Sequence, residues 1–76
     1  MSEAVSVDVL AELPGNIWKV EVATGTRVES GQCLLVMETM KMEIPVHAES
    51  AAYVAEVRVH PGDQVAAGDV LVVLAP

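Results

Sequence analysis

The chain has few of the residues on which disulfides, metal centres and nucleic-acid interfaces depend. Its single cysteine, Cys33, excludes an intramolecular disulfide, and no CxxC motif or Cys/His cluster has metal-ligand spacing. The apolar surroundings of this cysteine in QCLLVM predict a buried, unreactive thiol. Only 4 residues are basic against 11 acidic ones, and the basic residues are scattered, which excludes nucleic acid as a partner.

Long apolar segments are also absent. No apolar run is long enough to span a membrane, and no basic segment followed by an apolar one resembles a secretory signal. We therefore expect a soluble, cytoplasmic protein that does not bind membranes. Its net charge of −7 favours solubility and basic partner surfaces. The 76 residues predict one domain, residues 1–76, near the size at which a single core is only just sufficient.

Alternation of apolar and polar residues with a period of two dominates the sequence, and apolar residues at helical spacing are rare. The segments Val5–Leu10, Ile17–Val22 and Tyr53–Val59 alternate in this way. Cys33–Glu38 and Val70–Leu74 are continuous apolar runs of strand length, which is typical of strands buried on both faces. Glycine and proline separate these segments, so the sequence predicts an all-β fold, a flattened barrel or sandwich.

An internal repeat relates the two halves of the chain. A shift of 37 residues aligns Val5–Thr39 with Met42–Pro76, and 10 of the 35 aligned pairs are identical. Neither half can bury its apolar face alone, so the repeat predicts two four-stranded antiparallel sheets related by internal pseudo-twofold symmetry. Residues 40–41 fall between the halves and correspond to the chain ends. We therefore expect this connection and the two termini at opposite ends of the molecule.

The connection between the halves has an unusual sequence for a tight hairpin. In VMETMKMEIPVH, two strand-like runs meet at Met40-Lys41-Met42 without Gly, Asn, Asp or Pro. A tight hairpin favours two central residues with positive φ, which cost Met and Lys about 1 kcal/mol each. Such a departure from local preference is typical of functional sites. A wider, relaxed turn in which Lys41 is merely solvated fits the same residues.

The motif ETMKME resembles the attachment motif of the biotinyl domain family, in which a lysine between two methionines on an exposed hairpin is biotinylated. The resemblance extends through ELPGNIWKVEVATGTRVESGQCLLVMETMKMEI and VAEVRVHPGDQVAAGDVLVVLA, and includes the paired glycine turns. It looks closest to stand-alone biotin/lipoyl attachment proteins and to the carrier subunits of small acyl-CoA carboxylases. The connection VATGTRV is too short for the protruding thumb of some bacterial carrier subunits.

The resemblance implies covalent attachment of biotin to Lys41, with Met40 and Met42 as flanking recognition residues. A biotin protein ligase would perform the attachment, because a solvated lysine amine is almost entirely protonated at neutral pH and does not react unaided. Glu38 and Glu43 either contribute to ligase recognition or only solvate the tip. The two methionines have an alternative role as gap-fillers at the end of the barrel.

The implied function is that of a biotin carboxyl carrier, which performs no catalysis itself. It would shuttle a carboxyl group between the biotin carboxylase and carboxyltransferase sites of a biotin-dependent carboxylase, such as an acyl-CoA carboxylase. The sequence shows no catalytic triad, no acid/base pair of carboxylates and no phosphate-binding loop. Two alternatives remain: a lipoyl carrier, although lipoylation sites typically read Asp-Lys-Ala, and an unmodified structural or adaptor domain.

Overall fold

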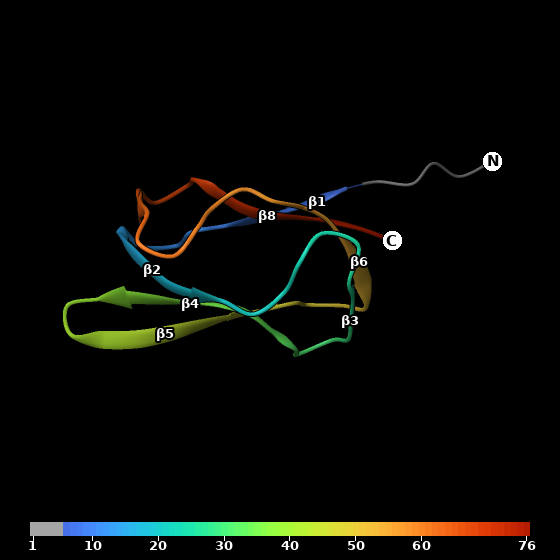
Figure 1. Ribbon diagram of the computed structural model, residues 1–76, viewed down its shortest axis with the longest axis horizontal. Helices are drawn as coiled ribbons and strands as arrows, with labels where there is room; N and C mark the ends of the chain where they lie inside the picture. The colour runs from blue at the N-terminus through green and yellow to red at the C-terminus, as the bar shows by residue number, and fades with distance from the viewer. Residues whose placement is uncertain (1–5) are drawn as a thin grey trace.

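The computed structural model describes residues 6–76 and shows eight β-strands in this range (Figure 1). They are β1 (Val7–Leu10), β2 (Gly15–Val20), β3 (Arg27–Val28), β4 (Cys33–Thr39), β5 (Met42–His47), β6 (Ala52–Val57), β7 (Gln64–Val65) and β8 (Val70–Ala75). The described range has no helix, and hence none long and apolar enough to cross a membrane. The predicted domain of residues 1–76 and the predicted strand start at Val5 lie partly outside the described residues.

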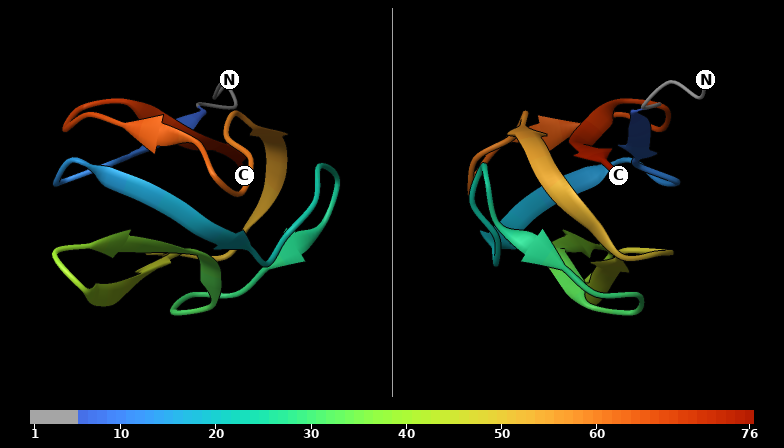
Figure 2. Two further views of the ribbon diagram at one scale, coloured as in Figure 1. Left: turned by 60° about the vertical axis from the view of Figure 1, so that its left-hand side comes forward. Right: turned by 90° about the vertical axis from the view of Figure 1, so that its right-hand side faces the viewer.

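The strands form two antiparallel sheets of four strands each. One sheet has the order β1-β8-β6-β3 and the other has the order β5-β4-β2-β7. The strands wrap around a common interior, as the turned views in Figure 2 show. The predicted all-β sandwich of two four-stranded antiparallel sheets is therefore confirmed.

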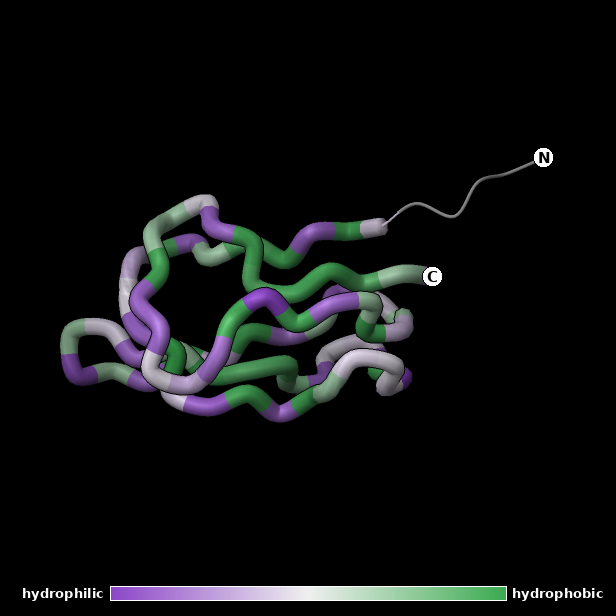
Figure 3. The backbone as a smooth tube through the Cα atoms, turned by 45° about the horizontal axis from the view of Figure 1, so that its top comes forward, coloured by the Kyte–Doolittle hydropathy of each residue, from purple (hydrophilic) through white to green (hydrophobic). Residues whose placement is uncertain are grey.

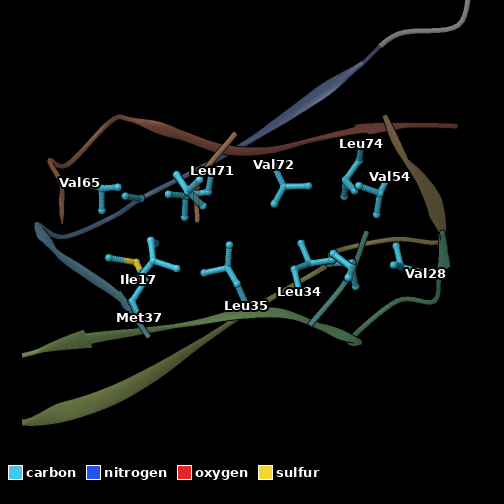
Figure 4. Packing of buried hydrophobic residues seen from close by; sticks show 14 residues of the cluster. Ile17, Val28, Leu34, Leu35, Met37, Val54, Val65, Leu71, Val72 and Leu74 are labelled. Atoms are coloured by element: carbon cyan, nitrogen blue, oxygen red, sulfur yellow. The ribbon is translucent and has the colours of Figure 1, made fainter. Parts of the chain in front are cut away.

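The core lies between the sheets and is one cluster of buried apolar residues. Leu35 of β4 and Leu71 and Val72 of β8 have no exposed surface and point toward one another across the interior (Figure 4). Burying one such side chain stabilises a fold by about 1.5–3 kcal/mol. Hydrophobic stretches follow the strands through the interior, whereas most connections are hydrophilic or neutral (Figure 3). In the strands whose sequence alternates, the apolar residues therefore point inward and the polar residues point outward.

Consecutive residues are buried in both continuous apolar runs, and a β-bulge in each run accounts for part of this burial. Leu34 and Leu35 are consecutive in β4, yet both belong to the core cluster. A β-bulge allows this, because the pairing with β5 passes from Cys33 to Leu35 and skips Leu34. Val36, between the buried Leu35 and Met37, lies on the opposite face of β4 and is also buried, at 8% exposure. The prediction of a strand buried on both faces is therefore confirmed for β4, whereas in β8 Val73 is only partly buried.

The β-bulges follow the 37-residue repeat. Leu71 of β8 is skipped in the pairing with β1, in the same way as Leu34 is skipped in β4. A second equivalent pair lies at Trp18 in β2 and Ala55 in β6. The repeat therefore specifies irregularities of the sheets as well as their regular parts.

Backbone hydrogen bonds from the glycine turns join the two halves reciprocally. The Gly25 N–H donates to the Val54 carbonyl at 2.7 Å, and the equivalent Gly62 N–H donates to the Ile17 carbonyl at 2.7 Å. Each half thus satisfies polar backbone groups of the other half. The predicted internal pseudo-twofold symmetry is confirmed at the level of individual bonds.

Two strands begin earlier than the alternation of residues predicts. The predicted strand Ile17–Val22 is observed as β2 (Gly15–Val20), and Tyr53–Val59 is observed as β6 (Ala52–Val57). Gly15 joins the sheet because it pairs with Val65 of β7, a partner 50 positions away that local periodicity does not reveal. At the other end of each strand, the chain leaves the sheet and runs toward a glycine turn. The valines at the predicted strand ends, Val22 and Val59, nevertheless remain in the core.

Cys33 is half-buried, whereas the sequence predicted a buried residue. It is the first residue of β4 and pairs with the exposed His47, so it lies at the margin of the core. Its Sγ donates a hydrogen bond to the Leu35 carbonyl at 3.4 Å.

The β4–β5 hairpin projects from one end of the molecule. The C-terminus and the start of β1 lie at the opposite end (Figure 1). For the described residues, this confirms the predicted separation of the hairpin from the chain ends.

Candidate functional site

Lys41 lies in a two-residue turn between β4 and β5. The register of the two strands ends at the pair Thr39 and Met42, which leaves Met40 and Lys41 as the central residues. Their φ angles are 50° and 68°, so both are left-handed, as a type I′ hairpin turn requires. Of the two turns that the sequence left open, the tight one is observed, and the wider, relaxed turn is not.

The turn retains backbone strain that glycine would relieve. Left-handed backbone costs a residue with a side chain about 1–2 kcal/mol. The paired strands on both sides hold the turn in this conformation, with six residue pairs between Cys33–Thr39 and Met42–His47. Among residues 6–76, Met40 and Lys41 are the only residues other than glycine with positive φ.

The side chains of the turn are directed into solvent. Met40 is 90% exposed and Met42 is 62% exposed, so neither methionine fills a gap in the core. That role belongs to Met37, which is 4% exposed. Lys41 is exposed and, within the described part of the chain, its amine has no ion pair or hydrogen bond.

Glu38 and Glu43 lie directly opposite each other on the hairpin, one pair below the turn. Both side chains are exposed, and neither forms an ion pair with Lys41. Like charges directly opposite each other in antiparallel strands are destabilising. The two glutamates therefore surround the base of the tip with negative charge and do not stabilise it.

Gly15 of β2 lies beside the base of the hairpin, close to Glu38 and Thr39. The neighbouring Asn16 forms the last residue pair between β2 and β4 before the tip, with Glu38. A Cβ atom at Gly15 would lie 2.8 Å from the Glu38 carbonyl oxygen and 3.1 Å from the Thr39 Cβ. Sequence reasoning missed this contact, because Gly15 and Glu38 are distant in the sequence and meet only through the pairing of β2 with β4.

A shallow surface groove of about 820 Å³ runs beside the turn. It is bordered by three segments that are distant in the sequence, 14–16, 38–41 and 64–66, together with Asp69. In the part of the chain that the structure describes, no group of three His, Cys, Asp or Glu side chains could hold a metal ion. The reactive group at this end of the molecule is the accessible primary amine of Lys41, which another enzyme can acylate.

Comparison with known proteins identifies the family to which nearly the whole chain is similar. The family model described as "Biotin-requiring enzyme" matches residues 6–74. The biotin/lipoyl attachment protein of Bacillus subtilis is 45% identical over 67 residues, which are 88% of this chain and 92% of that protein. The biotinylated protein TB7.3 homolog of Mycobacterium leprae is 41% identical over 68 residues, 90% of this chain and 96% of that one.

Solved structures share the fold as well. The urea carboxylase of Kluyveromyces lactis matches with a TM-score of 0.87 and 31% identity, over 97% of this chain and 6% of that enzyme. A single-chain, multi-domain long-chain acyl-CoA carboxylase matches with a TM-score of 0.86 and 33% identity, over 91% of this chain and 7% of that enzyme. From its sequence match over residues 6–74 and its relatives, we conclude that the chain belongs to the biotin/lipoyl attachment family.

Proposed function

We propose that this protein is a biotin carboxyl carrier and that Lys41 is its site of biotin attachment. The observation that carries the proposal is the conformation of the turn. A lysine without an ion pair in the described chain occupies a strained, left-handed position at the projecting end of the molecule. A strained, non-glycine residue that the surrounding strands hold in place is typical of a functional position.

The attachment chemistry requires a primary amine and little else from this chain. The deprotonated Lys41 Nζ attacks the acyl carbon of biotinyl-adenylate, which a biotin protein ligase supplies. An amide bond forms, AMP leaves, and a base of the ligase takes the amine proton. The β4–β5 ladder holds the amine away from the body of the domain, and the exposed Met40 and Met42 offer the ligase contact surface beside it.

The carrier role rests on the family of the chain and on the exposed lysine to which biotin would be attached. When attached, biotin supplies a ureido nitrogen that carries a carboxyl group. The partners would be a biotin carboxylase, which loads that group, and a carboxyltransferase, which removes it. Tethering to a small domain gives a high local concentration at both sites. The similar domains in urea and acyl-CoA carboxylases support this proposal. The cytoplasmic location stays a prediction.

The direct test is enzymatic labelling of the purified protein. Incubation with a biotin protein ligase, ATP and biotin is expected to add one biotinyl group to each chain, measured by intact mass. The chain has two lysines, and Lys19 is a matched control because it is partly exposed but paired with Glu21 at 3.0 Å. Lys41→Arg is expected to abolish labelling, whereas Lys19→Arg leaves it unchanged. An unlabelled but folded wild-type protein would overturn the proposal.

Lipoate is the second candidate, because the Bacillus subtilis relative is named for both attachments. A lipoate ligase that labels the protein where the biotin ligase does not would establish the lipoyl carrier. An unmodified adaptor domain would resist both enzymes.

A further inference from the structure

We propose that Gly15 is a positioning residue that sets where the hairpin, and hence the Lys41 amine, lies relative to the rest of the domain. The inference rests on the proposed function of Lys41. It assigns a specific task to a glycine that is remote from the turn in sequence and has no part in the attachment chemistry.

The closest contact would be with a backbone atom, which cannot move aside as the end of a flexible side chain can. The nearest atom to a Cβ at Gly15 would be the Glu38 carbonyl oxygen, at 2.8 Å. The Thr39 Cβ at 3.1 Å and the Met37 Cε at 3.4 Å would follow. Real Cβ atoms do not approach a backbone oxygen this closely, so a side chain at position 15 must push the end of β4 outward.

The glycine is not required by its own backbone conformation. Gly25, Gly31, Gly62 and Gly68 have positive φ, and a Cβ at each of them would meet nothing within 4 Å. Gly15 is the reverse case, without positive φ but with crowded surroundings. Its role is therefore close approach of two strands and not turn formation.

The internal repeat provides a natural comparison for this position. The residue equivalent to Gly15 is Ala52, which pairs with Val28 of β3 as Gly15 pairs with Val65 of β7. The fold thus accepts alanine at this position in the half where β8 ends at Ala75. The glycine occurs in the half where the facing strand continues into the hairpin.

A displacement at the end of β4 affects the amine strongly because nothing beyond that point is paired to β2. Asn16 and Glu38 form the last residue pair between the two strands. From there to Lys41 the hairpin is paired only within its own two strands. A misplacement of about 1 Å at a reacting atom lowers a rate by about 100-fold.

The test is Gly15→Ala, with biotinylation kinetics and NMR measured well below the unfolding temperature. We expect kcat for labelling to fall by about 10- to 100-fold with a much smaller change in KM, because the amine is misaligned while the ligase still contacts the exposed tip. The Met37 methyl signal and the amide signals of residues 38–43 are expected to shift. Those spectra need no biotin, so they test the displacement even if the wild-type protein is not labelled.

Two control variants separate positioning from stability. Ala52→Gly, at the equivalent position, is expected to leave kcat unchanged. Gly25→Ala introduces strain away from the hairpin and is expected to lower stability without lowering kcat at the same temperature. Unchanged kcat and unchanged hairpin signals in Gly15→Ala would overturn the proposal. Global unfolding of that variant, or an equal loss of kcat in Gly25→Ala, would also overturn it, because the effect would then be one of stability.

Discussion

The turns of this domain fall into two kinds that differ in how they satisfy a positive φ angle. At residues 25, 31, 62 and 68 the angle lies between 84° and 95°, and each position is a glycine. At residues 40 and 41 the angles are 50° and 68°, and the residues are methionine and lysine. The first kind relieves backbone strain, whereas the second retains it.

The difference shows where stability and function have separate requirements. The glycine turns recur in both halves and donate the backbone hydrogen bonds that join them, so they serve the fold. A glycine at position 41 would relax the hairpin but remove the amine. Natural proteins commonly retain such local strain where activity depends on it. The strain at Met40-Lys41 is therefore located at the proposed attachment site and not in the body of the domain.

The largest expected effect on stability comes from removing glycine from the first kind of turn. The double variant Gly25→Ala/Gly62→Ala places two alanines at φ angles of 91° and 95°. At about 1–2 kcal/mol per residue, we expect the free energy of unfolding to fall by about 2–4 kcal/mol, measured by urea denaturation. An unchanged free energy would show that positive φ is not what these turns require.

An opposite change of somewhat smaller size is expected in the second kind of turn. Met40→Asn/Lys41→Gly supplies the sequence that a type I′ turn favours. We expect the free energy of unfolding to rise by about 1–3 kcal/mol while biotinylation is lost. Met40→Asn alone keeps the lysine, so it is the matched control for loss of the amine: labelling at Lys41 should weaken, because Met40 offers the ligase contact surface, but should not be abolished. No gain in stability would contradict the account of a strained turn.

The smallest expected effect concerns the charges below the tip. Glu38→Gln removes the repulsion from Glu43 and is expected to raise the free energy of unfolding by about 0.2–1 kcal/mol at low salt. The gain should shrink as ionic strength increases, because exposed charges are screened. Glu56→Gln is the control, since the residue opposite Glu56 is the uncharged Val73. An equal gain in both variants would exclude cross-strand repulsion as the cause.

The sequence was informative wherever the repeat or the local alternation encodes the structure. The 37-residue shift predicted both sheets, the equivalent glycine turns and the position of the hairpin opposite the described chain ends. A turn at Met40-Lys41 was predicted because two strand-like runs meet there, and the absence of turn-forming residues marked that turn as unusual. These features depend on neighbouring residues or on comparison of one half with the other.

Features that depend on contacts between distant strands were not predicted. The bulges at Leu34 and Leu71 arise from the register with a neighbouring strand, which apolar content alone does not reveal. The closeness of Gly15 to Glu38 arises because β2 lies beside the end of β4 in the same sheet. Single residues whose function is to leave space are not visible in a pattern of polar and apolar residues.

The central claim is that the strained turn holds Lys41 outward as the one residue that partner enzymes modify. Its most direct test is the intact mass of the protein purified from its native cells, followed by peptide mapping. If Lys41 is the attachment site, the protein is heavier than its sequence by one biotinyl group, carried by the peptide that contains Lys41. A bare chain in cells with active biotin ligase, or a modification on any other residue, would contradict it.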